Sequence, residues 1–307
     1  MGQKTGQKIS RKRCKRNFST IGLLLLIYVM IVMVLPYAFN TYMVETNSPI
    51  LKDDILYYGI YFIALMFGTL IPFSIMRRFS RIKLKRIIRL IDASFVDLFV
   101  QTIVFFTICI ALTFVSTTIV NYFGFEGKLI SSIGFNYDSS NLSNHLYVFL
   151  LIIVSPILEE YAFRGVLLNS LSRYGKVFAL VASSLIFALA HSNFAEIIPA
   201  FAMGIALGKT SLRYKSIQPT ILIHILFNSF VYLLCIMPSK IAGYMAYGLV
   251  AICILAGYLY LSGRYERIVI QKSKNNKIAN TLFFSRITVI LSLIIMVAYT
   301  IVMTLTY

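Results

Sequence analysis

Nine apolar runs, most of them about 20 residues long, dominate this sequence of 307 residues. A helix that crosses a bilayer needs about 20 mostly apolar residues, and the runs lie near residues 20–39, 55–76, 95–120, 146–169, 177–192, 196–213, 218–237, 241–262 and 286–306. Hydrophobic residues make up 59% of the chain and charged residues 13%, against about 45–50% and about 25% in an ordinary soluble domain. The sequence therefore predicts an all-α polytopic transmembrane helical bundle of about nine spans, and it excludes a water-soluble or a disordered chain.

The formal net charge of +18 comes from Lys and Arg that lie between the apolar runs. This arrangement is not that of a nucleic-acid-binding protein. Every second loop is basic, and the basic stretches are residues 4–16, 77–89, 173–176, 213–215 and 264–286. Because cytoplasmic loops retain Lys and Arg, we expect a multi-pass cell-membrane protein with its N-terminus in the cytoplasm and its C-terminus outside.

The spans fall into three groups. Residues 1–144 hold a basic tail and three spans, residues 145–240 hold spans four to seven, and residues 241–307 hold two further spans. Spans five and six are short and are separated only by residues 192–196. They are predicted either to cross the membrane fully or to form a re-entrant hairpin.

Ionisable residues away from the span ends are concentrated in spans four, five and seven. Span four carries Glu159, Glu160 and Arg164, span five ends in His191, and span seven contains His224 and Asn228. A charge in the middle of a membrane helix costs at least about 2.5–3.5 kcal/mol, so such residues require a functional or structural reason. These three spans are the predicted catalytic core.

Helical geometry gives the two glutamates different roles. Residues i and i+4 share a helix face, whereas adjacent residues point about 100° apart. Glu160 is therefore expected to pair with Arg164 as structural support, and Glu159 is expected to be the free carboxylate. By the same spacing, His224 and Asn228 face one direction.

The depth of these side chains is consistent for three of the four candidate catalytic residues. At 1.5 Å per residue from the cytoplasmic ends, Glu159 lies roughly 13 Å deep, His224 roughly 9 Å and Asn228 roughly 15 Å. His191 lies deeper, at roughly 20 Å.

These residues suit hydrolysis of a carbonyl compound. Glu159 can take a proton from water, His191 can hold that water, and His224 with Asn228 can donate to the oxyanion. Alternatively, Glu159, His191 and His224 can ligate a zinc ion with one position open for water. The residues alone leave a zinc-dependent and a metal-free mechanism equally open.

Three motifs resemble those of a known family. Glu159-Glu160-x-x-x-Arg164, Phe187-x-x-x-His191 and His224-x-x-x-Asn228 are similar to the motifs of the CAAX protease and bacteriocin-processing intramembrane endopeptidases, also called CPBP or Abi proteins. The resemblance covers about residues 145–240. It implies that Glu159 activates water, that His191 assists, and that His224 and Asn228 stabilise the oxyanion. The family is often classed as metallopeptidases, although a metal-free mechanism is also proposed for it.

The resemblance implies an intramembrane endopeptidase whose partners are a peptide or membrane-protein substrate and the lipid bilayer. The family includes maturation of prenylated C-termini, processing of bacteriocin-like or pheromone-like peptides, and self-immunity to bacteriocins. A composition rich in Lys and Ile is typical of low-GC bacteria, which favours peptide processing or immunity. A non-catalytic scaffold or immunity protein of the same fold is the first alternative, and an ion-coupled or proton-coupled transporter is the second.

Overall fold

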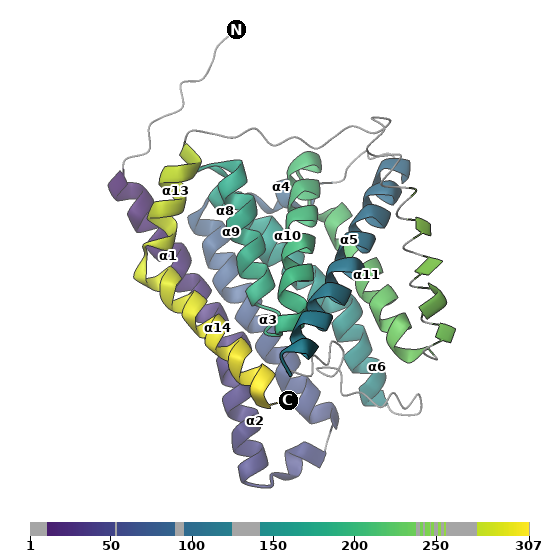
Figure 1. The fold of residues 1–307 in the computed structure, drawn as a ribbon. Coiled ribbons are helices and arrows are strands. Elements are labelled where there is room, and N and C mark those ends of the chain that lie inside the picture. Colours follow the sequence, from purple (N-terminus) through teal and green to yellow (C-terminus); the bar gives the residue numbers. More distant parts are fainter. Residues whose placement is uncertain are drawn as a thin grey trace.

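The computed structural model describes residues 11–52, 54–89, 95–124, 142–237 and 275–306, together with scattered positions between 240 and 255. Every regular element within these residues is a helix, as predicted for an all-α protein. The helices pack side by side as a bundle (Figure 1). Their bounds are α1 Arg11–Val29, α2 Leu35–Glu45, α3 Asp54–Phe79, α4 Leu84–Ile87, α5 Phe95–Tyr122, α6 Leu142–Phe149, α7 Ser155–Glu159, α8 Asn169–Ser172, α9 Lys176–Leu189, α10 Phe194–Tyr214, α11 Gln218–Ile236, α13 Asn275–Phe284 and α14 Ile287–Thr306.

Two of the long helices contain π-helical segments. The segment η1 (Met30–Val34) joins α1 to α2, so that Arg11–Glu45 forms one helix. Two further segments, η4 (Leu150–Val154) and η5 (Glu160–Leu168), connect α6, α7 and α8 into a second continuous helix. A short 3-10 helix, η2 (Pro49–Lys52), precedes α3.

Within the part of the chain that the structure describes, six helices are long and apolar enough to cross a membrane: Arg11–Glu45, Ile55–Phe79, Val96–Tyr122, Asn144–Ser172, Phe194–Tyr214 and Ile287–Leu305. Two shorter apolar helices, Lys176–Leu189 and Gln218–Leu234, correspond to predicted spans five and seven. Most of predicted span eight, near 241–262, lies outside the described residues. The helical membrane bundle is confirmed, and the count of nine spans stays a prediction.

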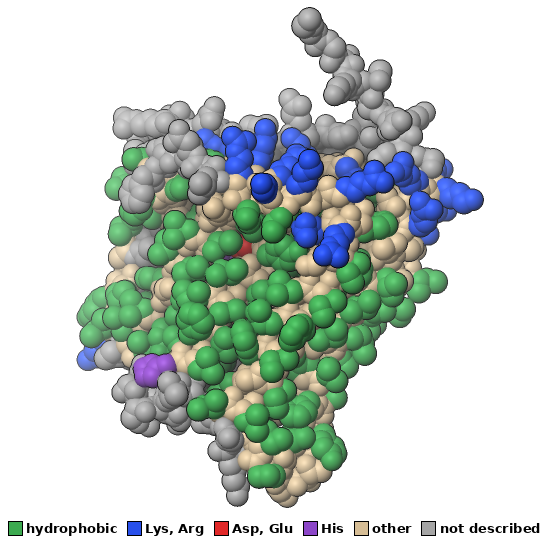
Figure 2. Space-filling view, turned by 180° about the vertical axis from the view of Figure 1, so that it is seen from behind, with side chains coloured by type: hydrophobic (Ala, Val, Ile, Leu, Met, Phe, Trp, Pro, Cys, Tyr) green, Lys and Arg blue, Asp and Glu red, His purple; other side chains and the backbone are tan. Residues whose placement is uncertain are grey.

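Lys and Arg side chains gather along one end of the bundle, above a face that is largely hydrophobic (Figure 2). This basic end includes the start of α1 and the end of α3, where Arg77 and Arg78 occupy the last turn. The adjoining α4 adds Lys85 and Arg86. The charge therefore has the one-sided distribution from which we predicted that this end faces the cytoplasm.

Helices α9 and α10 form a tightly packed antiparallel hairpin. A Cβ atom placed on Gly204 of α10 would lie 2.9 Å from the Cα of Ser184 in α9, closer than side chains tolerate. With 14 residues, α9 is about 21 Å long, which is shorter than the roughly 30 Å hydrocarbon core. Helix α10 has 21 residues and is long enough to cross the membrane. Because α9 is shorter than the hydrocarbon core, we expect the turn between the two helices to lie within the thickness of the bundle.

The first and last described helices run in parallel and in contact. Thr288 Oγ1 of α14 donates to the backbone oxygen of Ser19 at 3.0 Å, and Ser292 Oγ donates to that of Gly22 at 3.2 Å. Gly22 allows this approach, because a Cβ there would meet the Val289 backbone nitrogen at 2.7 Å. Residues about 270 positions apart in sequence thus close the bundle.

An aromatic cluster joins these outer helices to the middle of the bundle. Tyr28 of α1 packs on Phe73 of α3 with ring centroids 5.4 Å apart, and Phe73 packs on Phe163 at 5.8 Å. Phe163 in turn contacts Phe187 of α9 at 5.3 Å. The rings form an apolar floor behind the polar residues of spans four, five and seven.

Candidate active site

The two glutamates lie where the helix of span four changes from α to π geometry. Glu159 is the last residue of α7 and Glu160 is the first of η5. Where the π segment ends, Asn169 Nδ2 donates to the backbone oxygens of Arg164 and Gly165, both at 3.0 Å. Irregular helical turns of this kind often occur at functional sites, and here a side chain stabilises the carbonyls that the irregular turn displaces.

Glu160 and Arg164 form the predicted structural pair. Arg164 Nη1 donates to Glu160 Oε1 at 2.6 Å, and the two residues are 2% and 0% exposed, respectively. The guanidinium also lies over the ring of Phe187, 4.0 Å from its centroid. A buried ion pair of this kind is retained by mutual compensation, because either charge alone would be strongly unfavourable.

The buried glutamate also orients His224 from α11. His224 Nδ1 lies 2.9 Å from Glu160 Oε1, and because a carboxylate only accepts hydrogen bonds, Nδ1 carries the proton. The other ring nitrogen, Nε2, then faces Glu159 Oε2 at 3.8 Å. Glu160 therefore fixes the imidazole in one orientation toward the second carboxylate.

Glu159 has the partly exposed position predicted for the free carboxylate. Its side chain is 22% exposed, and its second oxygen, Oε1, accepts a hydrogen bond from Ser155 Oγ at 2.5 Å. The carboxylate is thus held on one side by Ser155 and open on the other toward His224. Sequence reasoning missed Ser155, although its i−4 spacing from Glu159 was a usable signal.

His191 occupies the turn after α9. Its Nδ1 lies 2.9 Å from the backbone oxygen of Phe187, which leaves Nε2 directed elsewhere. The chain reverses at Ser192, whose φ is 57°, and Asn193 Oδ1 then caps α10 by accepting from the Ala195 nitrogen at 2.9 Å. His191 thus lies just beyond the end of a short helix, and its depth relative to the other three residues stays a prediction.

Phe187 contacts both histidines. Its ring centroid lies 4.6 Å from that of His191 and 6.0 Å from that of His224. The structure thus brings Glu159, Glu160 and His224 together, and His191 contacts the same buried ring that His224 contacts. A second residue that the sequence did not single out is Glu196, which accepts a hydrogen bond from Asn193 Nδ2 at 3.2 Å in the turn that carries His191.

Asn228 contacts the helix of span four rather than the glutamates. Its Nδ2 donates to the backbone oxygen of Leu151 at 3.0 Å. Leu151 lies in the π segment η4, where its carbonyl would pair with the nitrogen of residue 156, but Pro156 has no N–H. Asn228 replaces this missing donor and ties α11 to span four, and its oxyanion role stays a prediction.

The side chains as they stand do not fit a metal. Among the described residues, no three His, Cys, Asp or Glu side chains are arranged to hold a metal ion, and this includes the proposed zinc set Glu159, His191 and His224. A zinc requirement stays a prediction, and we derive no step from it.

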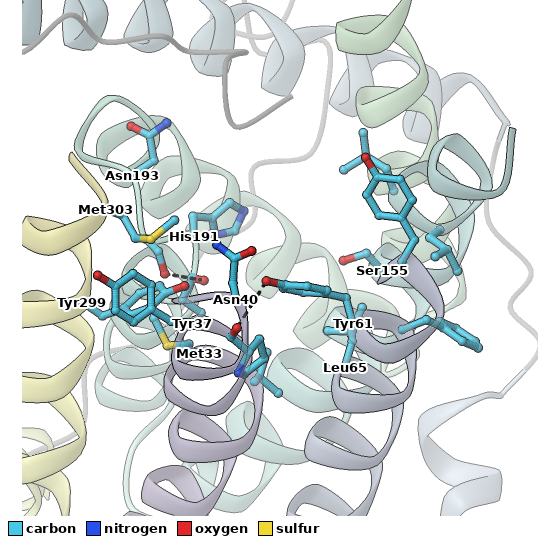
Figure 3. Close-up of a pocket in the computed structure, with 18 of the residues that line it drawn as sticks. Met33, Tyr37, Asn40, Tyr61, Leu65, Ser155, His191, Asn193, Tyr299 and Met303 are labelled. Atoms are coloured by element: carbon cyan, nitrogen blue, oxygen red, sulfur yellow. Dashed lines mark hydrogen bonds between the residues drawn. The ribbon is translucent and has the colours of Figure 1, made fainter. Parts of the chain in front are cut away.

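A cavity of about 570 Å³ reaches the site from one side. Its inner part is lined by Ser155 and His191, and its wall carries six tyrosines, which are Tyr37, Tyr57, Tyr58, Tyr61, Tyr147 and Tyr299. Figure 3 shows His191 and Ser155 on different parts of the lining, with Tyr61 and Asn40 between them. Among the described residues, no Lys, Arg, Asp or Glu lines the cavity.

Comparison with known proteins finds similarity over the segment that holds this site. Residues 141–230 match the family model described as Type II CAAX prenyl endopeptidase Rce1-like. The chain is 38% identical over 93 residues to the "Membrane-embedded CAAX protease MroQ" of Staphylococcus aureus (strain USA300), which covers 28% of this chain and 38% of that protein. It is 33% identical over 89 residues to the "Putative membrane peptidase YdiL" of Bacillus subtilis (strain 168), which covers 29% of this chain and 36% of that protein.

The matched segment spans little more than a third of the length of these curated relatives. No solved structure matches the chain. All the motif residues, from Glu159 to Asn228, lie within residues 141–230. Over this segment the chain is similar to the CAAX protease and bacteriocin-processing family of membrane endopeptidases, which confirms the resemblance that its motifs indicated.

Proposed function

We propose that this protein is an intramembrane endopeptidase in which Glu159 activates the water that hydrolyses a peptide bond. The observation that carries the proposal is the 3.8 Å separation of Glu159 Oε2 and His224 Nε2. That distance is too long for a direct hydrogen bond and suits one water that contacts both atoms.

Charge balance assigns the protonation states. With His224 protonated, the formal charges of Glu159, Glu160, Arg164 and His224 sum to zero, which is the favourable state for a buried cluster. His224 then has an N–H on Nε2, at the position where a substrate carbonyl oxygen gains negative charge.

The reaction follows from these positions. Glu159 takes a proton from the water, and the resulting hydroxide adds to the carbonyl carbon of the substrate. The oxyanion accepts a hydrogen bond from His224, and Glu159 then returns the proton to the leaving amine nitrogen. His191, with Nδ1 engaged by Phe187, offers Nε2 to the water or the substrate from the cavity side.

The substrate that we propose is a peptide or membrane protein, in a processing or bacteriocin self-immunity role. Among the relatives' names, the CAAX protease name of MroQ and the membrane peptidase name of YdiL support peptide hydrolysis. The scaffold alternative is separated from this proposal by the experiment below.

The test compares the peptide termini that appear in membranes containing wild-type protein, Glu159→Gln and Glu45→Gln. Glu45 is an exposed carboxylate at the end of α2, so its substitution makes the same chemical change away from the site. We expect Glu159→Gln to lower cleavage by about 10²–10⁴-fold, the usual contribution of a general base, and Glu45→Gln to leave it unchanged.

Two outcomes would contradict the proposal. Equal termini in wild type and Glu159→Gln, with a phenotype retained in both, would favour the non-catalytic scaffold. Loss of wild-type cleavage on treatment with 1,10-phenanthroline, followed by recovery with added Zn²⁺, would replace direct activation by Glu159 with metal-dependent chemistry.

A further inference from the structure

Most of the cavity wall comes from helices outside residues 141–230. The helix α1–α2 contributes Met33, Tyr37 and Asn40, while α3 contributes Tyr57 and Tyr61 among others. The end of α14 adds Tyr299, Met303 and Thr304. The family segment thus supplies the chemistry at the inner end, and the surrounding helices supply the surface that a substrate contacts first.

Three polar side chains of this wall, those of Asn40, Tyr57 and Tyr61, are paired with one another. Tyr57 Oη lies 2.9 Å from Asn40 Oδ1 and 3.2 Å from Tyr61 Oη, and Tyr61 Oη lies 3.3 Å from the backbone oxygen of Pro36. Hydroxyls satisfied within the wall leave mainly ring surface for an occupant. Because the described lining also lacks charged side chains, a charged group entering the cavity would lose its hydration without gaining a counter-charge.

The cavity lies in the half of the bundle away from the basic end. Tyr57 and Tyr61 belong to the first two turns of α3, whose last turn carries Arg77 and Arg78. Tyr299 and Met303 lie toward the end of α14, which begins directly after Arg286. On span four the lining runs from Tyr147 to Ser155, about 12 Å along the helix. An occupant therefore reaches Ser155 from the end opposite the Lys and Arg.

We propose that this cavity is the specificity site of the enzyme, and that it binds an uncharged, apolar segment of the substrate peptide approaching from the end opposite the basic residues. The inference rests on the proposed function for the reaction, but it assigns selectivity to α2, α3 and α14 rather than to the catalytic segment. The volume of about 570 Å³ lies within the roughly 300–1,000 Å³ of sites that enclose a small ligand, and it suits a few side chains of such a segment.

The test measures binding without cleavage. Glu159→Gln protein in proteoliposomes carries the photo-crosslinker p-benzoylphenylalanine in place of Tyr61, or, as the matched control, in place of Phe114, which is 75% exposed on α5. The first probe is a biotinylated ten-residue peptide of Leu, Phe, Ala and Ser with blocked ends. The second has Asp at two central positions, and the third is a short peptide ending in farnesylated Cys.

We expect position 61 to crosslink the first probe at least about ten-fold more than the second, because a buried charge costs more than the 1.4 kcal/mol that corresponds to ten-fold. Position 114 should give only background. A stronger signal from the farnesylated probe than from the apolar peptide would overturn the proposal in favour of a prenyl-binding cavity. Equal labelling at positions 61 and 114 would show that the cavity binds neither the apolar peptide nor the farnesylated peptide.

A charge placed in the cavity wall gives a test whose expected result is a gain of binding, which a misfolded protein would not show. Met303→Lys introduces a cation beside Tyr299, and we expect position 61 to gain crosslinking to the Asp-containing probe. An unchanged preference for the first probe would overturn the assignment of α14 to the specificity site. Wild-type protein incubated with the same probes tests cleavage separately. Binding of a probe without its hydrolysis would contradict the proposed protease function and would leave the proposed specificity site intact.

Discussion

Two adjacent carboxylates have opposite surroundings in this protein, and the difference decides their roles. Glu160 is fully buried between Arg164 and His224, whereas Glu159 is partly exposed and contacts Ser155. The roughly 100° between neighbouring side chains on a helix is enough to direct one into the protein and the other toward the cavity side. Glu160 therefore determines where His224 lies, and the partial exposure of Glu159 is what its proposed action on water requires.

Removing the Glu160 charge should cost stability more than any substitution of Glu159. Glu160→Gln leaves the buried Arg164 guanidinium without a counter-charge, for which the expected loss is about 3–5 kcal/mol, read as a lower thermal unfolding temperature in detergent. The double variant Glu160→Gln with Arg164→Gln should be less destabilised than the sum of the two single variants. Strict additivity would mean that the pair does not act as a unit.

At the residue scale, the sequence predicted what lies within one helix. The i+4 spacing correctly predicted the pair of Glu160 with Arg164 and the separate position of Glu159. The contact of His224 with Glu160 joins residues 64 positions apart, and no local pattern contains that information. His224 and Asn228 do share a face, but they contact different partners on span four.

At the scale of elements, the π segments change which backbone groups need partners. The carbonyl of Leu151 faces a position where Pro156 cannot donate, and Asn228 of α11 supplies the hydrogen bond instead. One backbone irregularity in span four thus determines how α11 docks, and with it the position of His224.

This arrangement predicts that Asn228 and Pro156 are coupled. Asn228→Ala removes a hydrogen bond worth about 0.5–1.5 kcal/mol and should lower stability and cleavage together. Pro156→Ala restores a backbone N–H near the same carbonyl, so the double variant should regain part of the unfolding temperature. If Asn228 acts only as this tie, cleavage recovers in parallel with stability.

Recovery of stability without recovery of cleavage would instead assign Asn228 the oxyanion role that its motif implies. The matched control is Asn169→Ala, which removes a side-chain donor to two other carbonyls of the same helix. The lower unfolding temperature of Asn169→Ala should not be restored by Pro156→Ala.

Hydropathy predicted helices well and their irregularities not at all. Predicted span seven, 218–237, is α11 at Gln218–Ile236, whereas span one, 20–39, is part of the longer helix Arg11–Glu45. Hydropathy identifies only the part of a helix that lies in hydrocarbon. Helix α1 extends beyond that part, because its first residues are basic and still helical. A π turn within an all-apolar stretch leaves no hydropathy signal, because every face of the helix is apolar.

At the scale of the whole molecule, charge and cavity lie in opposite halves. Most of the Lys and Arg side chains visible in Figure 2 mark one end, and the tyrosine-walled cavity occupies the other half. If the basic end faces the cytoplasm, as cytoplasmic retention of Lys and Arg predicts, the cavity receives its substrate from the outer half of the membrane.

Reporter fusions test this orientation. Alkaline phosphatase fused after Tyr307 should be active, because it folds only outside the cytoplasm, and a green fluorescent protein at the same position should be dark. Fusions after Arg81, in the basic stretch that follows α3, should give the reverse pattern. Fluorescence from the C-terminal fusion would invert the topology and would direct the cavity to the cytoplasm.

The sequence could not predict this cavity. Its lining combines residues from six stretches between Val32 and Thr304, and apolar spans with many tyrosines look alike whether they face lipid or a substrate. The catalytic motifs were readable because charges in a membrane helix are rare.

The parallel contact of α1 with α14 has a consequence for the order in which the enzyme becomes complete. Tyr299, Met303 and Thr304 form part of the cavity wall, yet α14 leaves the ribosome after all the catalytic residues have been made. A nascent chain thus holds Glu159 and His224 in the membrane before this part of the cavity wall exists. If the cavity selects the substrate as we propose, insertion of α14 is the step at which that selectivity is acquired.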